Sequence, residues 1–168
     1  MKKINSSSIR DDYDYNNISI EIDHIVVNPD KRVYVILTDG ERQAGLEITS
    51  FEASMLSFVH KELHKNSHIN TIHQLFVKLL HQIHTKVESV CIESKVGDIV
   101  YASLKTVDEK HNRAFSITSL VDGLILACIE NAPIFAVNNV WKHMDEIDEW
   151  DYEEYIFDYD PEEDDEED

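Results

Sequence analysis

The sequence predicts a single α+β domain in which a mixed β-sheet carries three helices, in the order β-β-β-α-α-β-β-β-α-β. Two observations lead to this prediction. Segments that are apolar at every second position alternate with segments whose apolar residues recur every three or four positions. A chain of 168 residues also suits one domain with extensions. We expect a flexible N-terminus at 1–16, the domain at 17–144 and a tail at 145–168.

Three short strands are predicted to open the domain. The segment ISIEIDHIVV (18–27) alternates apolar and polar residues, and RVYVIL (32–37) is rich in β-branched and aromatic residues. The segment AGLEIT (44–49) follows as a third strand. The connecting segments, NPDK and TDGERQ, have the composition of turns.

Two helices are predicted to come next, each beginning with a capping box. Thr49 precedes Glu52 by three residues, and Thr71 precedes Gln74 by three. Behind these caps the apolar residues follow helical spacing. In the second helix they form one apolar face, which consists of Ile72, Leu75, Phe76, Leu79, Leu80 and Ile83.

The second half of the domain is predicted to form a hairpin, a strand, a helix and a last strand. The hairpin pairs 87–93 with 98–107, and the segment AFSI (114–117) continues the sheet. The helix at 119–130 is apolar nearly all round, so we expect it to be buried, with Leu124, Ile125 and Cys128 in the core. Asn131 and Pro133 end that helix, and PIFAV (133–137) forms the last strand.

Charge separates the domain from its tail. The net charge is −19, and residues 145–168 hold sixteen Asp and Glu with no Lys or Arg. The remainder has 34 − 16 = 18 acids against 15 bases, or about −3. We therefore expect at most weak contact with nucleic acid, which depends on a basic field. The tail also carries aromatic residues, so it is either a solubilising extension or a segment that docks on a basic protein.

The sequence also bears on the compartment. No segment has the roughly 18 consecutive apolar residues of a membrane span, and the N-terminus lacks the apolar stretch of a secretory signal. We therefore expect a cytoplasmic location and no membrane contact. Cys91 and Cys128 both lie in apolar runs, which predicts buried thiols in a reducing compartment rather than a disulfide.

Three strings resemble the bifunctional nuclease domain family. They are LEITSFEA (46–53), HQLFVKLLHQI (73–83) and VDGLILACIENAPIFAV (121–137). Together with the order of the surrounding strands, the resemblance covers about 120 residues, from the first strand to about Val140. It implies the α+β fold of that family and cleavage of DNA and RNA. We also expect a homo-oligomer.

The chain departs from that family at the positions of two arginines. The family usually has an Asp followed by Arg-Pro-Ser-Asp-Ala at the start of the third helix. In this chain Ile117 stands at the position of the family's first Asp, and Ser119 stands at the position of its Arg. Of the acids in that motif, only Asp122 is kept. Ile69 and Asn70 replace an Arg-Pro pair before the second helix. Because Arg binds phosphate through two hydrogen bonds, these losses predict weak or absent nuclease activity. The alternative is a non-catalytic binding or assembly module.

The resemblance implies three candidate catalytic residues, each of which also has a structural interpretation. Asp122 and Glu52 match acidic positions of the family and would hold Mg²⁺ or Mn²⁺ near a phosphate. His73 matches a family histidine and would act as a general base or bind phosphate. Alternatively, both acids are members of capping boxes, with Ser119 and Thr49 as the caps. His73 would then be a neutral, hydrogen-bonded residue at a helix N-terminus.

Further histidines stand at helical spacing. His60, His64 and His68 are four residues apart, and His81 and His84 are three apart. Such pairs can bind Zn²⁺ or Ni²⁺. Since no cysteine or acid stands at a ligand spacing beside them, we interpret them as solvated residues on the polar faces of the helices.

Overall fold

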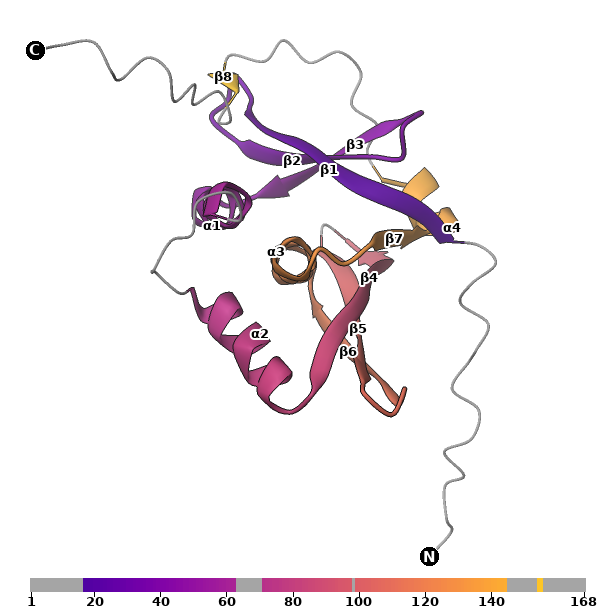
Figure 1. The fold of residues 1–168 in the computed structure, drawn as a ribbon. Coiled ribbons are helices and arrows are strands. Elements are labelled where there is room, and N and C mark those ends of the chain that lie inside the picture. Colours follow the sequence, from indigo (N-terminus) through magenta and orange to yellow (C-terminus); the bar gives the residue numbers. More distant parts are fainter. Residues whose placement is uncertain (1–16, 63–70, 98, 145–153, 156–168) are drawn as a thin grey trace, which may run out of the picture.

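The structure is a computed structural model that describes residues 17–62, 71–97, 99–144 and 154–155. The predicted α+β fold and its order of elements are confirmed (Figure 1). The elements are β1 (Asn17–Val27), β2 (Val33–Thr38), β3 (Gln43–Ile48), α1 (Ser50–Glu62), α2 (Ile72–Gln82), β4 (Thr85–Val96), β5 (Ile99–Asp108), β6 (Arg113–Ser119), α3 (Leu120–Glu130), β7 (Ile134–Val137), α4 (Asn138–Lys142) and β8 (Glu154–Tyr155). The proposed N-terminal segment, the linker histidines His64 and His68, and most of the tail lie outside the described residues.

The strands form one mixed sheet in the order β3-β2-β1-β7-β4-β5-β6, with β8 added beside β1. β1 joins the two halves of the sheet. Its first four residues pair with β7, and its later residues pair with β2. Among the strands that the structure describes, the only parallel pair is β4 with β7, because α3 carries the chain back across the sheet between β6 and β7.

The helix α3 occupies the centre of the fold, as its composition predicts. It lies between strands β1–β3 and strands β4–β6 (Figure 1) and also contacts α1 and α2. Leu124 and Ile125 are buried, and Cys128 is partly buried against the core. Gly123 lets the helix approach the sheet, since a Cβ there would lie 3.1 Å from Cγ1 of Val90. α3 ends at Asn131, whose left-handed conformation (φ 51°) was expected.

Both cysteines are free thiols, as predicted. Burial raises the pKa of Cys91 to about 11, with a further contribution from Glu93, and burial alone raises the pKa of Cys128 to about 11. The two thiols are therefore protonated at neutral pH and are poor nucleophiles.

The short helix α4 was not predicted, and it is held by the turn between β2 and β3. The Trp141 side chain is 1 % exposed, and its indole nitrogen donates a 2.7 Å hydrogen bond to Oδ2 of Asp39. The guanidinium of Arg42 donates hydrogen bonds to the carbonyl oxygens of Trp141 and Met144, and lies over the indole ring. These contacts close the carboxyl end of the domain onto its first hairpin.

The apolar face predicted for α2 is only partly covered. Val77 is the buried residue of that helix, and Leu80 packs partly against the core. The remaining members of the apolar face are exposed, namely Ile72, Leu75, Phe76, Leu79 and Ile83. Within the described part of the chain, no helix combines the length and apolar character that a membrane span requires.

Candidate functional site

The two candidate acids each stand at the third residue of a helix, where the predicted caps are present. At α1, the hydroxyl of Thr49 accepts a hydrogen bond from the Glu52 backbone nitrogen (3.2 Å). The Glu52 carboxylate accepts from the Thr49 backbone nitrogen (2.8 Å) and hydroxyl (2.7 Å). At α3, the Ser119 hydroxyl accepts from the backbone nitrogen of Asp122 (3.1 Å) and donates to its Oδ2 (2.6 Å). Both acids therefore stabilise the start of their own helix.

Asp122 also binds a histidine from another helix. The N-termini of α2 and α3 lie side by side, and Nε2 of His73 is 2.9 Å from Oδ1 of Asp122. The His73 side chain is 16 % exposed, whereas that of Asp122 is 52 % exposed. The hydrogen bond from Ser119 is the main cause that lowers the pKa of Asp122. Burial acts to raise this pKa, and His73 acts to lower it further. The structure thus brings two of the three candidate residues together.

The orientation of His73 limits what it can do. Because an ionised carboxylate only accepts hydrogen bonds, the imidazole proton is assigned to Nε2, which faces Asp122. The other ring nitrogen, Nδ1, is enclosed and finds no hydrogen-bond partner within the described part of the chain. A general base needs its free nitrogen within reach of the proton that it removes. In this arrangement the free nitrogen of His73 faces the interior of the protein.

Glu52 is not joined to this pair. Its carboxylate is used by Thr49, and no hydrogen bond or ion pair connects it to either His73 or Asp122. In the described ranges, no group of three or more His, Cys, Asp and Glu side chains is arranged to hold a metal ion. The oxygens of Glu52 and Asp122 are of the type that Mg²⁺ prefers, and each carboxylate accepts a hydrogen bond from the capping hydroxyl of its own helix. Their assignment as ligands stays a prediction.

A second histidine–carboxylate pair joins the same two helices at their carboxyl ends. Nε2 of His81 is 2.9 Å from Oε1 of Glu130. Each pair spans 49 residues of sequence, and the two pairs are eight residues apart on each helix. α2 and α3 are therefore parallel, with the pairs separated by roughly 12 Å along the axes. The regular spacing of these residues was present in the sequence, but only the packing of the helices shows that they meet.

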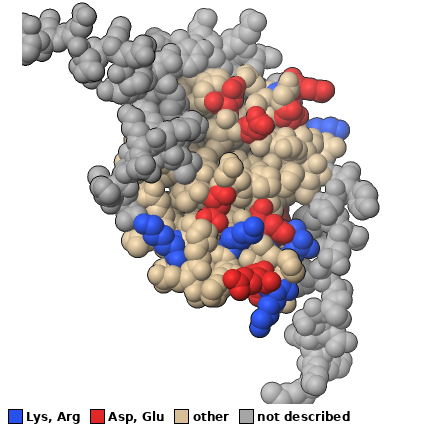
Figure 2. All heavy atoms as spheres, viewed as in Figure 1, with Lys and Arg blue, Asp and Glu red and all other residues tan. Residues whose placement is uncertain are grey.

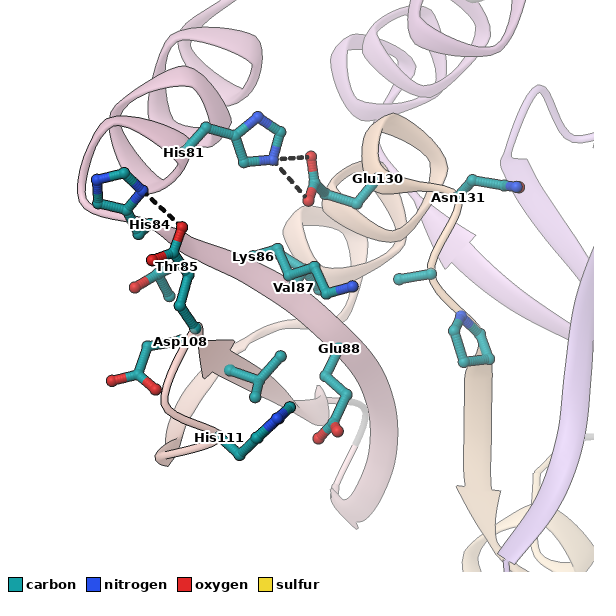
Figure 3. Close-up of a pocket in the computed structure, with 14 residues that line it drawn as sticks. His81, His84, Thr85, Lys86, Val87, Glu88, Asp108, His111, Glu130 and Asn131 are labelled. Atoms are coloured by element: carbon teal, nitrogen blue, oxygen red, sulfur yellow. Dashed lines mark hydrogen bonds and ion pairs between the residues drawn. The ribbon is translucent and has the colours of Figure 1, made fainter.

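The second pair borders a pocket of about 730 Å³ at the carboxyl ends of α2 and α3 (Figure 3). His81 and His84 approach this pocket with different partners. His81 binds Glu130 on α3, whereas Nδ1 of His84 is 2.9 Å from Oε1 of Glu109, which follows β5. The two imidazoles are held by separate carboxylates rather than by a common centre. Of the first series of histidines, His60 lies on α1.

The charges around the site are mixed. On the face shown in Figure 2, Lys and Arg side chains lie among Asp and Glu side chains. Lys105 and Arg113 both bind the carboxylate of Glu88, at 3.1 and 3.0 Å. Within the His73–Asp122 pair, the more exposed member is the carboxylate of Asp122, whose pKa is lowered. A carboxylate in this state is ionised at neutral pH and repels a phosphodiester.

A model of the bifunctional nuclease domain matches residues 35–148, from the middle of β2 to beyond α4. The match includes Glu52, His73 and Asp122. No curated protein matches the chain.

Proposed function

Because the chain belongs to the bifunctional nuclease domain family, we propose that it is a divergent member with weak or no phosphodiester hydrolysis that works as a binding or assembly module. The family is named for nuclease activity, and the chain retains its fold.

The orientation of His73 carries the proposal. In an Asp–His pair that acts as a general base, the nitrogen remote from the acid receives a proton from the attacking water. In His73 that nitrogen is Nδ1, which is enclosed. Water and substrate would therefore reach the carboxylate of Asp122 before they reach a basic nitrogen. The pair is better suited to holding α2 against α3 than to activating a nucleophile.

The residue at the start of α3 supports the same conclusion. The position that resembles the family's arginine is Ser119, whose hydroxyl accepts from the Asp122 backbone nitrogen and donates to the Asp122 carboxylate. Ser119 supplies no positive charge, and its one hydroxyl proton could be donated to a phosphate only if the bond to the Asp122 carboxylate broke. A transition state with developing negative charge on phosphate needs cationic or N–H donors. The pair of His73 and Asp122 offers the phosphate a carboxylate instead.

The other expectations remain proposals. A divalent ion such as Mg²⁺ or Mn²⁺ would supply charge neutralisation at a phosphate if Glu52 and Asp122 bound it. The cytoplasmic location and docking of the tail on a basic protein are likewise proposed. Binding through the tail is the assembly function that the charge distribution favours, since sixteen acids stand within residues 145–168.

The test is release of nucleotides from single-stranded DNA and from RNA by the purified full chain, with Mg²⁺ or Mn²⁺ present. We expect wild type and Asp122→Asn to show the same background rate. His73→Gln serves as a second variant, because glutamine keeps a hydrogen-bonding side chain but has no basic nitrogen. Circular dichroism verifies that each variant is folded.

Robust turnover by the wild type that both variants abolish, with the fold intact, would overturn the proposal. That result would make the pair catalytic and would require His73 to turn its free nitrogen outward during the reaction. Turnover that neither variant affects would also contradict it, and would place the active site elsewhere in the domain.

A further inference from the structure

One side of β1 has a stretch without a strand partner. On this side residues 17–20 pair with β7, and Val26 and Val27 pair with β8. β7 and β8 thus lie at opposite ends of β1 (Figure 1). Among the strands that the structure describes, none pairs with residues 21–25 on this side, whereas the other side of β1 pairs with β2. The backbone groups of such a stretch can pair with an added strand.

A pocket of about 670 Å³ lies at the β7 end of this stretch. Its walls come from residues 19–22 of β1, from the carboxyl end of α3 and from the segment that leads into β7. Most of the side chains along these walls are apolar, namely Ile20, Ile22, Ala127, Cys128, Ala132, Pro133 and Ile134. A strand added to β1 would therefore meet a surface that accepts apolar side chains.

β8 shows from which direction a strand is added. It pairs antiparallel with β1, with Glu154 opposite Val27 and Tyr155 opposite Val26. In an antiparallel pair, each further residue of one strand stands opposite an earlier residue of the other. The chain that leaves β8 in this direction therefore runs along residues 21–25 towards β7.

The residues after β8 suit a strand of the required length. The stretch of β1 without a partner spans residues 21–25, and residues 156–160 are also five in number. Their sequence is IFDYD, in which isoleucine, phenylalanine and tyrosine all favour strands. Pro161 follows, and a proline cannot donate a hydrogen bond to a strand ladder. The sequence thus permits a strand up to residue 160 and ends it there.

We propose that this edge of β1 is the docking site of the chain's own tail, in which residues 156–160 continue β8 along residues 21–25. The tail is the fitting occupant because β8 already begins the pairing, and because the covalent connection keeps the next residues beside the edge. Docking closes an edge that would otherwise be open to foreign strands. It divides the tail into an aromatic part that binds the domain and an entirely acidic part, 162–168, that stays available to a partner.

The register of β8 specifies the contacts. Ile156 stands opposite Ile25, and Phe157 stands opposite His24. Regular pairing ends there, because the pairing of β1 with β2 has a bulge at Asp23 and a bulge disturbs the ladder around it. Past the bulge, the tail reaches the pocket beside the start of β7.

The first experiment measures amide hydrogen exchange at residues 21–25 of the full chain by NMR. Ile156→Pro combined with Phe157→Pro removes a bond to β1 whichever of the two residues faces it. We expect this change to make exchange on the docked side at least about tenfold faster. The matched control places both prolines at Glu162 and Glu163, beyond the strand, and should exchange like wild type. Unchanged exchange in β2 and β3 verifies the fold.

The second experiment tests the register with engineered disulfides in the full chain. His24→Cys with Phe157→Cys places two thiols opposite each other, and mild oxidation should link them. His24→Cys with Tyr159→Cys is the control, because a shift of two residues separates the positions by about 7–8 Å, too far for a disulfide. A bond within one chain leaves the mass of the denatured protein at 19.5 kDa. Wild type serves as the blank for Cys91 and Cys128.

Three outcomes would overturn the inference. The first is exchange at residues 21–25 that matches wild type in the Ile156 and Phe157 variant, or that both proline variants change alike. The second is protection that disappears on dilution or a disulfide that doubles the mass, since either would place the tail of another molecule on this edge. The third is equal disulfide formation by the two cysteine pairs, as expected for a tail that does not dock. None of these results depends on whether the chain hydrolyses nucleic acid.

Discussion

Glu130 keeps its carboxylate almost entirely buried, with 8 % of the side chain exposed, and His81 meets it from the more exposed side at 2.9 Å. Nδ1 of His84 lies at the same distance, 2.9 Å, from Oε1 of Glu109, but both of those side chains are at least 70 % exposed. The same chemical pair thus occurs twice in one pocket at different burial. This difference decides which pair stabilises the fold.

We expect His81→Ala to lower the free energy of unfolding by about 1 kcal/mol, since it leaves a buried carboxylate without its partner. His84→Ala is the matched control and should change it by at most about 0.5 kcal/mol, as an exposed ion pair contributes little. Urea unfolding measures both. If the two variants lost the same free energy of unfolding, the buried carboxylate of Glu130 would not depend on His81, and this account would be contradicted.

The stability contribution of Asp122 should vary with pH. Its pKa in the folded protein is lowered, first by the Ser119 hydroxyl and then by His73. A lowered carboxyl pKa stabilises the fold above the unfolded value of about 3.9, and this contribution disappears as pH falls through the folded pKa. Because Asp122 is half exposed, we expect Asp122→Asn to cost less than about 1 kcal/mol at neutral pH.

The measurement is urea unfolding of wild type and Asp122→Asn at a series of pH values. The two curves of stability against pH should converge below about pH 4. Both proteins carry the same tail, so its protonation cancels in the difference. A gap that stays constant into the acid range would show that the ionised form of Asp122 has no special role.

Ser119 should contribute through its cap. Ser119→Ala removes both the acceptor for the Asp122 backbone nitrogen and the donor to its carboxylate. We expect a loss of about 1 kcal/mol in the free energy of unfolding. Ser119→Thr keeps the hydroxyl and should retain most of that stability. If alanine and threonine behaved alike, the hydrogen bonds of the cap would be energetically irrelevant.

Trp141 should fix α4 through its indole nitrogen. Burial tends to raise the pKa of Asp39, but hydrogen bonds from the Arg42 and Glu41 backbone and from Trp141 lower it overall. Trp141→Phe keeps an aromatic ring beneath Arg42 and removes the 2.7 Å bond to Asp39. We expect a loss of roughly 1–3 kcal/mol. Asp39→Asn keeps a single acceptor oxygen, which cannot serve both the indole nitrogen and the backbone nitrogens of Glu41 and Arg42. It should therefore also lower the free energy of unfolding by roughly 1–3 kcal/mol, and an Asn variant as stable as wild type would contradict this account.

The acidic tail should oppose contact with nucleic acid. Deletion of residues 156–168 removes nine acids and leaves β8 in place. We expect this deletion to strengthen binding to single-stranded DNA at low salt, and added salt to reduce the difference. Replacing the nine acids with Asn and Gln is the control and should act like the deletion. Equal binding by full-length and shortened chains at low salt would show that the tail does not mask the domain.

The sequence alone was sufficient for features that depend on neighbouring residues. The helix caps at Thr49, Thr71 and Ser119 each join groups three residues apart, so the local pattern specifies them. The caps at Thr49 and Thr71 are full capping boxes, whereas at Ser119 the return bond to the acid comes from the hydroxyl. The all-apolar composition of α3 predicted its burial, because such a helix is stable only when it is covered. The strands followed from alternation, and the family followed from the resemblance of three local strings together with the order of the elements.

Only the tertiary structure decided which of these residues meet. His73 and Asp122 are 49 residues apart, and nothing near either one specifies the parallel packing of α2 on α3 that places Nε2 beside Oδ1. The same packing left most of the apolar face of α2 exposed and turned Nδ1 of His73 inward. Periodicity reveals that a helix has an apolar face, but which surface covers that face depends on contacts between distant segments. The same contacts determine whether an acid and a histidine stabilise the packing of two helices or take part in catalysis.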